Sequence, residues 1–109
     1  MTIEELVEMI TRIGCPFAYD HFSEGESPEP PFICYLLPGS DNFAADGRVY
    51  FKISQVRIEL YTDLKDISLE KKVEDVLDEA DIFYEKSEVW IQSEKLYEVL
   101  YSFEVPVTD

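Results

Sequence analysis

The stretch Tyr97-Glu-Val-Leu-Tyr-Ser-Phe-Glu-Val105 carries a large apolar side chain at every second position. A period of two is typical of a β-strand that buries one face in a core. Pro106 follows directly and ends the strand, because proline has no backbone N–H to donate. Upstream, Phe83-Tyr84 and Val89-Trp90-Ile91 supply a second set of apolar residues. Residues 82–105 are therefore predicted to form an antiparallel pair of strands.

A helical pattern precedes this pair. Its apolar residues recur every three or four positions, at Leu69, Val73, Val76, Leu77 and Ala80. Ser68 or Asp66 is the expected N-cap, because a short polar side chain can accept from the free amides of the first turn. Charge runs like the one on the opposite face usually lie in solvent. We therefore expect a solvated outer face made of Glu70, Lys71, Lys72, Glu74, Asp75, Asp78 and Glu79.

The N-terminal part of the chain is predicted to contain one helix and two strands. Thr2 and Glu5 have the spacing of a capping box, and apolar residues continue at helical spacing up to Gly14, so residues 3–13 predict an amphipathic helix. Residues 17–19 and 32–37 have the composition of short strands. Between them, residues 23–31 contain three prolines and three glutamates, which excludes a helix or a central strand. This segment is expected to be an exposed, acidic connection.

The middle of the chain combines a loop with a strand whose pattern changes phase. Residues 39–47 are predicted to be a loop that ends in the turn Asp46-Gly47. Apolar residues then occupy odd positions from 49 to 53 and even positions from 56 to 60. One long strand cannot change phase without an extra residue, so we expect a β-bulge or a sharp bend near Ser54-Gln55. The alternative is that both faces of the strand are partly covered there.

These elements follow the order α-β-β-β-α-β-β. The predicted fold is α+β, with two helices packed on one face of an antiparallel or mixed sheet. The length corresponds to a single domain, residues 1–109.

The charge balance restricts the classes of partner. The chain has 24 Asp and Glu against 9 Lys and Arg, a formal net charge of −15, yet 46% of its residues are hydrophobic, which favours a folded chain over a disordered acidic one. Nucleic acids and anionic membranes are bound through Lys/Arg clusters, so we expect neither as a direct partner. The N-terminus does not have the pattern of a signal peptide, so a cytoplasmic location is expected, with Cys15 and Cys34 as reduced thiols.

The residues give little indication of catalysis, and we predict no enzyme activity, cofactor or metal site. A Cys15–His21 thiolate–imidazole pair and a carboxylate pair of glycosidase type stay open as alternatives. Asp41, Asn42 and Asp46 could suggest a calcium loop. Their spacing lacks the alternating ligands and the terminal glutamate of helix–loop–helix sites, so a plain turn is favoured.

Phe43 is the more informative residue of this loop. An aromatic side chain beside Asn42 and Ala44-Ala45 either folds back onto the core or contacts a partner, and both outcomes are open. We predict that the loop 39–47 and the connection 23–31 form contact surfaces. The candidate interaction residues are Asp41, Asn42, Phe43, Asp46, Glu24, Glu26 and Glu29.

Several phrases of the sequence resemble known proteins. They are Glu-Gly-Glu-Ser-Pro-Glu-Pro-Pro-Phe-Ile-Cys-Tyr at 24–35, Asn-Phe-Ala-Ala-Asp-Gly at 42–47, Tyr-Glu-Lys-Ser-Glu-Val-Trp-Ile at 84–91 and Glu-Lys-Leu-Tyr-Glu-Val at 94–99. Over most of its length the chain resembles small prophage proteins of Gram-positive bacteria, encoded among head–tail joining and tail genes. In the order of its elements it also resembles the tail-terminator or tail-completion proteins of long-tailed phages with non-contractile tails.

This resemblance implies a structural subunit that assembles as a ring, usually a hexamer. Such a ring caps the tail tube and joins it to the head. The implied partners are further copies of the chain, the major tail-tube protein and the head–tail connector proteins, and the implied location is the tail or neck of the virion. An acidic lumen would repel the phosphates of passing DNA at short range. The alternative function is an acidic DNA mimic that inhibits a host DNA-binding protein.

Overall fold

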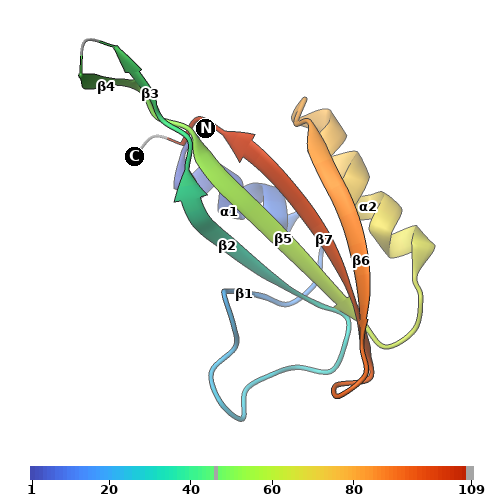
Figure 1. The fold of residues 1–109 in the computed structure, drawn as a ribbon. Coiled ribbons are helices and arrows are strands. Elements are labelled where there is room, and N and C mark those ends of the chain that lie inside the picture. The colour runs from blue at the N-terminus through green and yellow to red at the C-terminus, as the bar shows by residue number, and fades with distance from the viewer. Residues whose placement is uncertain (46, 108–109) are drawn as a thin grey trace.

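Two helices and a five-stranded sheet form the body of the protein in this computed structural model, which describes residues 1–45 and 47–107 (Figure 1). The helices are α1 (Ile3–Thr11) and α2 (Ile67–Glu79). The sheet contains β1 (Phe17–Tyr19), β2 (Phe32–Ser40), β5 (Ser54–Thr62), β6 (Tyr84–Ile91) and β7 (Leu96–Val105), and a separate ribbon contains β3 (Phe43–Ala45) and β4 (Arg48–Phe51). The order of the body's elements is α-β-β-β-α-β-β, which confirms the predicted α+β fold.

Both helices begin at the caps that the sequence predicts. Thr2 Oγ1 accepts from the Glu5 amide at 3.1 Å, while Glu5 Oε1 accepts from the Thr2 amide at 3.0 Å. In α2, Asp66 Oδ1 accepts from the Leu69 amide at 3.0 Å. These bonds satisfy amides that have no partner inside the helix. Neither helix in the described part of the chain is long and apolar enough to cross a membrane.

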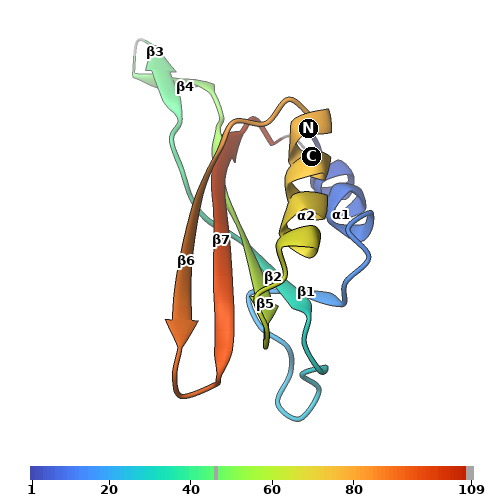
Figure 2. The same cartoon turned by 90° about the vertical axis from the view of Figure 1, so that its right-hand side faces the viewer.

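The strands are arranged in the order β1-β2-β5-β7-β6. The sheet is mixed, because β1 runs parallel to β2 while all other neighbours are antiparallel. Both helices cover the same face, and no helix of the described residues lies on the opposite face (Figure 2). At one end of the molecule, the Met1 ammonium group donates to the Pro106 carbonyl at 3.0 Å.

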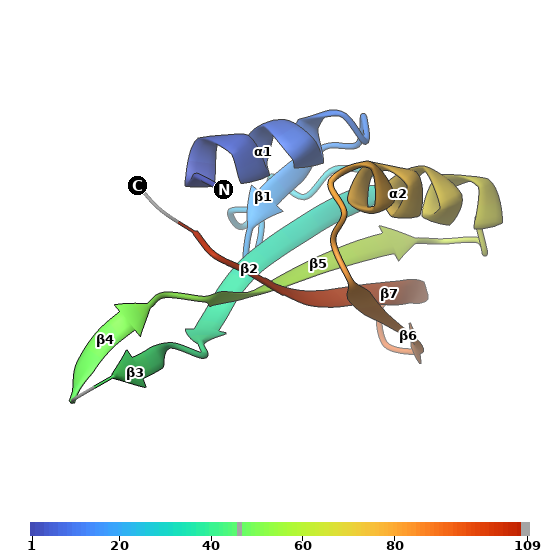
Figure 3. The same ribbon diagram turned by 90° about the horizontal axis from the view of Figure 1, so that it is seen from above.

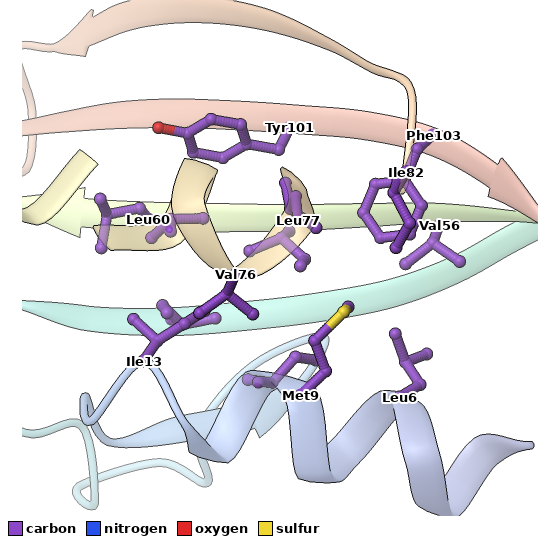
Figure 4. Packing of buried hydrophobic residues seen from close by; sticks show 14 of the residues in the cluster. Leu6, Met9, Ile13, Val56, Leu60, Val76, Leu77, Ile82, Tyr101 and Phe103 are labelled. Atoms are coloured by element: carbon purple, nitrogen blue, oxygen red, sulfur yellow. The ribbon is translucent and has the colours of Figure 1, made fainter. Parts of the chain in front are cut away.

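The core lies between the helices and the sheet (Figure 4). Alternate residues of β5 and β7 point into it, because successive side chains of a strand face opposite sides. Its fully buried members include Leu6, Ile10 and Ile13 near or in α1, Val73 and Leu77 in α2, Val56, Ile58 and Leu60 in β5, and Val99 and Tyr101 in β7. Each large apolar side chain buried here contributes about 1.5–3 kcal/mol relative to exposure.

The β3–β4 ribbon, which we call the arm, projects beyond the sheet and away from both helices (Figures 1 and 3). Two predictions were wrong here. Residues 39–47 are not simply a loop, because β2 continues to Ser40 and residues 43–45 form β3. The predicted single long strand is two strands, β4 and β5, separated at Lys52-Ile53. The phase changes because these two strands pair with different partners.

Candidate interaction surfaces

Asp41 and Asn42, two of the predicted interaction residues, fix the root of the arm. The Asp41 amide donates to the Ile53 carbonyl at 2.9 Å, and the Ile53 amide donates to Asn42 Oδ1 at 3.2 Å. Gln55 Nε2 donates to Asp41 Oδ2 at 3.1 Å. The two chain segments that enter and leave the arm are thus held together at the point where the arm leaves the sheet.

A pair of carboxyl groups adds to the root of the arm. Glu104 of β7 lies opposite Gln55 in the sheet register, and its side chain meets that of Asp41. Hydrogen bonding with Glu104, and then with Gln55, lowers the pKa of Asp41, while the same contact with Asp41 raises the pKa of Glu104. Of the two groups, Glu104 therefore takes up a proton more readily than Asp41, and the protonated Glu104 can donate to the Asp41 carboxylate.

The remaining candidates in this region are only partly described. The backbone of Phe43 pairs with that of Phe51 in the arm. The side chain of Phe43 and the whole of Asp46 lie outside the described residues, so the alternatives given for them above stay predictions. Gly47 has a φ of +74°, a value that suits glycine in a turn.

Glu24, Glu26 and Glu29 lie on the connection at the other end of the sheet from the arm (Figure 1). All three are exposed. The ends of the connection are anchored, since the Phe22 ring packs edge-on against Phe32 with 5.5 Å between centroids. The structure therefore places the described candidates at two separate sites, with Asp41 and Asn42 at the root of the arm and the three glutamates on the connection.

The cysteines and the histidine do not form an activated nucleophile. His21 is exposed, and its Nδ1 lies 2.7 Å from Asp20 Oδ2. Burial raises the pKa of the Cys15 thiol, and burial together with the nearby Glu59 raises that of Cys34 to about 11. Both are free thiols, and a raised pKa leaves them protonated and weakly nucleophilic at neutral pH. Among the described residues there is no cluster of His, Cys, Asp and Glu that could hold a metal ion.

The face of the sheet without helices carries a polar network that sequence reasoning missed. Tyr61 Oη donates to Glu98 Oε2 at 2.9 Å and contacts Glu59 Oε1 at 3.1 Å, while Arg57 lies 3.3 Å from Glu59. Glu59 is only 9% exposed, and this burial raises its pKa even though the Arg57 guanidinium acts to lower it. The signal was present in the sequence, because the polar residues of β5 alternate with its core residues and must share one face.

A second network joins α2 to β6 and corrects a prediction. Glu70 was expected on the solvated outer face, but it is 3% exposed. Its carboxylate contacts Lys65 Nζ at 2.7 Å and Lys86 Nζ at 2.9 Å. Burial alone would raise the pKa of Glu70, but the hydrogen bonds from the two lysines outweigh it and lower the pKa. Tyr101 Oη donates to Glu74 Oε2 at 2.7 Å beside them.

Large apolar side chains are exposed along β6. Phe83, directly before the strand, is 85% exposed, and Val89 and Trp90 near its end are 51% and 41% exposed. The start of β6 also borders an open groove of about 840 Å³, together with Phe103 and Val105 of β7. Exposed aromatic side chains of this kind are common anchors in protein interfaces.

The sequence matches no known protein-family model, and no curated protein is significantly similar to it.

Proposed function

We propose that the protein is a structural subunit of a phage particle that caps the tail tube and joins it to the head connector as part of a ring. The arm is the observation that carries this proposal. An isolated two-stranded ribbon is at best marginally stable in water. An arm that projects away from its own helices gains stability when it packs on another chain, which is how assembly subunits use such ribbons.

The charge distribution supports contact between copies through the arm. Residues 39–53 contain Asp41 and Asp46 against Arg48 and Lys52, so their formal charge is zero and the rest of the chain carries all of the −15. Two acidic bodies repel each other, whereas a neutral segment with several aromatic residues approaches an acidic body without that cost. The arm is therefore the part of the chain best suited to touch a neighbouring copy.

A contact between the arm of one subunit and the body of the next is head-to-tail. Contacts of this kind close into rings when the rotation between neighbours allows it. A ring of acidic bodies would repel DNA phosphates over about one Debye length, roughly 8 Å at physiological salt. Passing DNA would then not be held, as the tail-terminator role requires.

We rank the DNA mimic lower. Mimicry needs carboxylates that imitate an uninterrupted row of phosphates. On and near α2, several carboxylates are instead paired with cations of the same chain, through Lys71–Asp75 at 2.9 Å, Lys86–Glu74 at 2.9 Å and Arg12–Glu79 at 3.7 Å.

The test is the mass in solution by light scattering, at low and high salt, with and without a candidate tail-tube protein. We expect a ring in at least one condition, and its loss when residues 43–51 are replaced by Asn-Gly. A Glu24→Gln, Glu26→Gln, Glu29→Gln variant, altered at the far end of the sheet, is the matched control and should keep the ring. Phe43→Ala should weaken assembly with almost no change in the thermal midpoint of the monomer.

Two outcomes would overturn the proposal. One is a chain that stays below ring size in every condition and ignores the tube protein. The other is capture of a basic host protein that DNA displaces, which would favour the mimic. A large loss of thermal midpoint in Phe43→Ala would instead make Phe43 a core residue and leave the arm without its proposed anchor.

A further inference from the structure

The outer edge of β6 is an open end of the sheet. β6 is last in the strand order, and it pairs with β7 without interruption from Tyr84 opposite Phe103 to Ile91 opposite Leu96. Residues 85–90 are all exposed. Within the described part of the chain, the other edge of β6 pairs with no strand, so its outward N–H and C=O groups are free for a further strand.

Several of the usual protections of an edge strand are missing from β6. Proteins block such edges with proline, bulges, short strands or charged side chains, including charges that point inward. β6 has eight residues, no proline and no register shift. Its single lysine, Lys86, is held by Glu70 and Glu74 of α2, each at 2.9 Å. Lys86 is thus an inward-pointing charge of the strand, and two carboxylates of its own chain offset it.

We propose that two copies of the chain pair β6 with β6, antiparallel, about a two-fold axis through Ser87. In this register Lys86 lies opposite Glu88 of the partner subunit, and Tyr84 lies opposite Trp90 of the partner subunit. The two-fold repeats both pairs. Within its own chain Lys86 already contacts Glu70 and Glu74, and Glu88 contacts Lys65, so across the axis these residues extend existing ion pairs with unlike charges facing each other. The two aromatic pairs are of a kind that stabilises neighbouring strands.

Neighbouring registers are worse for reasons of charge or geometry. An axis through Glu88 sets this carboxylate opposite its own copy, and an axis through Lys86 does the same with two ammonium groups. Like charges directly opposite each other destabilise a strand pair. An axis between Ser87 and Glu88 is excluded by geometry, because it sets Lys86 opposite Val89 of the partner subunit, whose side chain lies on the other face of the sheet. Only the axis through Ser87 satisfies both the charged and the aromatic residues.

The pairing joins two five-stranded sheets into one continuous sheet, with all helices on one face. It is a two-fold contact at β6 and so differs from the head-to-tail contact proposed for the arm. Each copy carries a formal charge of −15, so the dimer strengthens as salt screens the repulsion.

Cysteine cross-linking tests the register. In Ser87→Cys the introduced cysteine lies on the two-fold axis, directly opposite the same cysteine of the other copy. The Cα atoms of directly opposed residues in an antiparallel pair lie about 4.5–5.5 Å apart, which is within the range of a disulfide. We expect Ser87→Cys to form a disulfide-linked dimer under mild oxidation, more than tenfold above both Glu85→Cys and the natural chain with Cys15 and Cys34. Equal cross-linking of the two variants would overturn the register.

A second variant tests the contact itself. Ser87→Lys places two ammonium groups opposite each other on the axis and should weaken the dimer at least tenfold, by light scattering, at the lowest salt concentration at which the natural chain dimerises. Glu85→Lys, which makes a larger change in net charge on the same face, should retain it. A natural chain that is monomeric at every salt concentration would overturn the pairing. The variant lacking residues 43–51 should still dimerise, which separates this inference from the proposed ring.

Discussion

Lys86 Nζ of β6 lies 2.9 Å from Oε1 of Glu70, a residue of α2 that is only 3% exposed. Lys65, in the connection before α2, contacts the other carboxylate oxygen at 2.7 Å. One buried carboxylate thus links three segments of the chain. Such a group is costly to bury and is tolerated because both of its oxygens are satisfied by cations. The position of α2 over β6 therefore depends on a complete set of charges.

Removing the central charge should destabilise the fold. In Glu70→Gln the two lysines lose their shared carboxylate, but their partly exposed ammonium groups can turn to solvent, so we expect a loss of about 2 kcal/mol, below the usual cost for a fully buried pair. Urea unfolding measures this loss. The control is Asp75→Asn, which breaks the exposed Lys71–Asp75 pair and should cost less than about 0.5 kcal/mol. Equal losses of stability in the two variants would show that the buried Glu70 ion pairs stabilise the fold no more than the exposed Lys71–Asp75 pair does.

The pH dependence of stability should differ in sign between Glu70 and Glu59. The two lysines lower the pKa of Glu70 despite its burial, so its contribution is present above its ordinary value of 4.5 and lost as pH falls through the lower folded value. Burial raises the pKa of Glu59, so its contribution is present below 4.5 and lost as pH rises through the folded value.

Urea midpoints from about pH 3 to pH 7 distinguish the two groups. Relative to the natural chain, Glu70→Gln should lose less stability on acidification below pH 4.5. Glu59→Gln should lack the gain that the natural chain shows as pH falls toward that value. If both variants change the profile in the same direction, one of the two assignments is wrong.

Local signals in the sequence were enough for most of the fold. Thr2 and Asp66 act within three residues of the amides they cap, and the period of two in residues 97–105 follows from one buried face. The strand β3 could not be found this way, because Phe43-Ala44-Ala45 is too short to show an alternation. Its pairing with β4 is the only feature that defines it as a strand.

The charged residues show where local reasoning failed. Glu70 lies three residues before Val73 and seven before Leu77, on the apolar stripe of α2, so its spacing already indicated burial. Its partner Lys86, however, comes from β6, and no local pattern places it there. Asp41 and Asn42 were selected as contact residues, yet they bond to Ile53 and Gln55 across the arm. Such long-range pairs depend on the folded sheet.

The hydroxyl group of Tyr101 should contribute measurably to stability. Tyr101 is fully buried, and its Oη donates to Glu74 Oε2 at 2.7 Å. In Tyr101→Phe the ring packing is kept and this charged hydrogen bond is lost, so we expect a cost of about 1.5 kcal/mol in urea unfolding, because Glu74 keeps its contact with Lys86. Tyr97→Phe, on the same strand but half-buried, should change stability by less than about 0.5 kcal/mol. If Tyr101→Phe left the free energy of unfolding unchanged, a water molecule would have replaced the hydrogen bond to Glu74.

The root of the arm should loosen locally when Asn42 is truncated. In Asn42→Ala the Ile53 amide loses its acceptor at Oδ1, while the bond from the Asp41 amide to the Ile53 carbonyl remains. Loss of one hydrogen bond worth about 1 kcal/mol should speed hydrogen exchange of the Ile53 amide roughly fivefold. Amides of β7, an interior strand of the sheet, serve as internal controls; that of Val99 should exchange at an unchanged rate, because it opens only with the whole domain. Faster exchange at Val99 as well would mean that the arm root and the core open as one unit, which contradicts a local effect of Asn42 on the arm root.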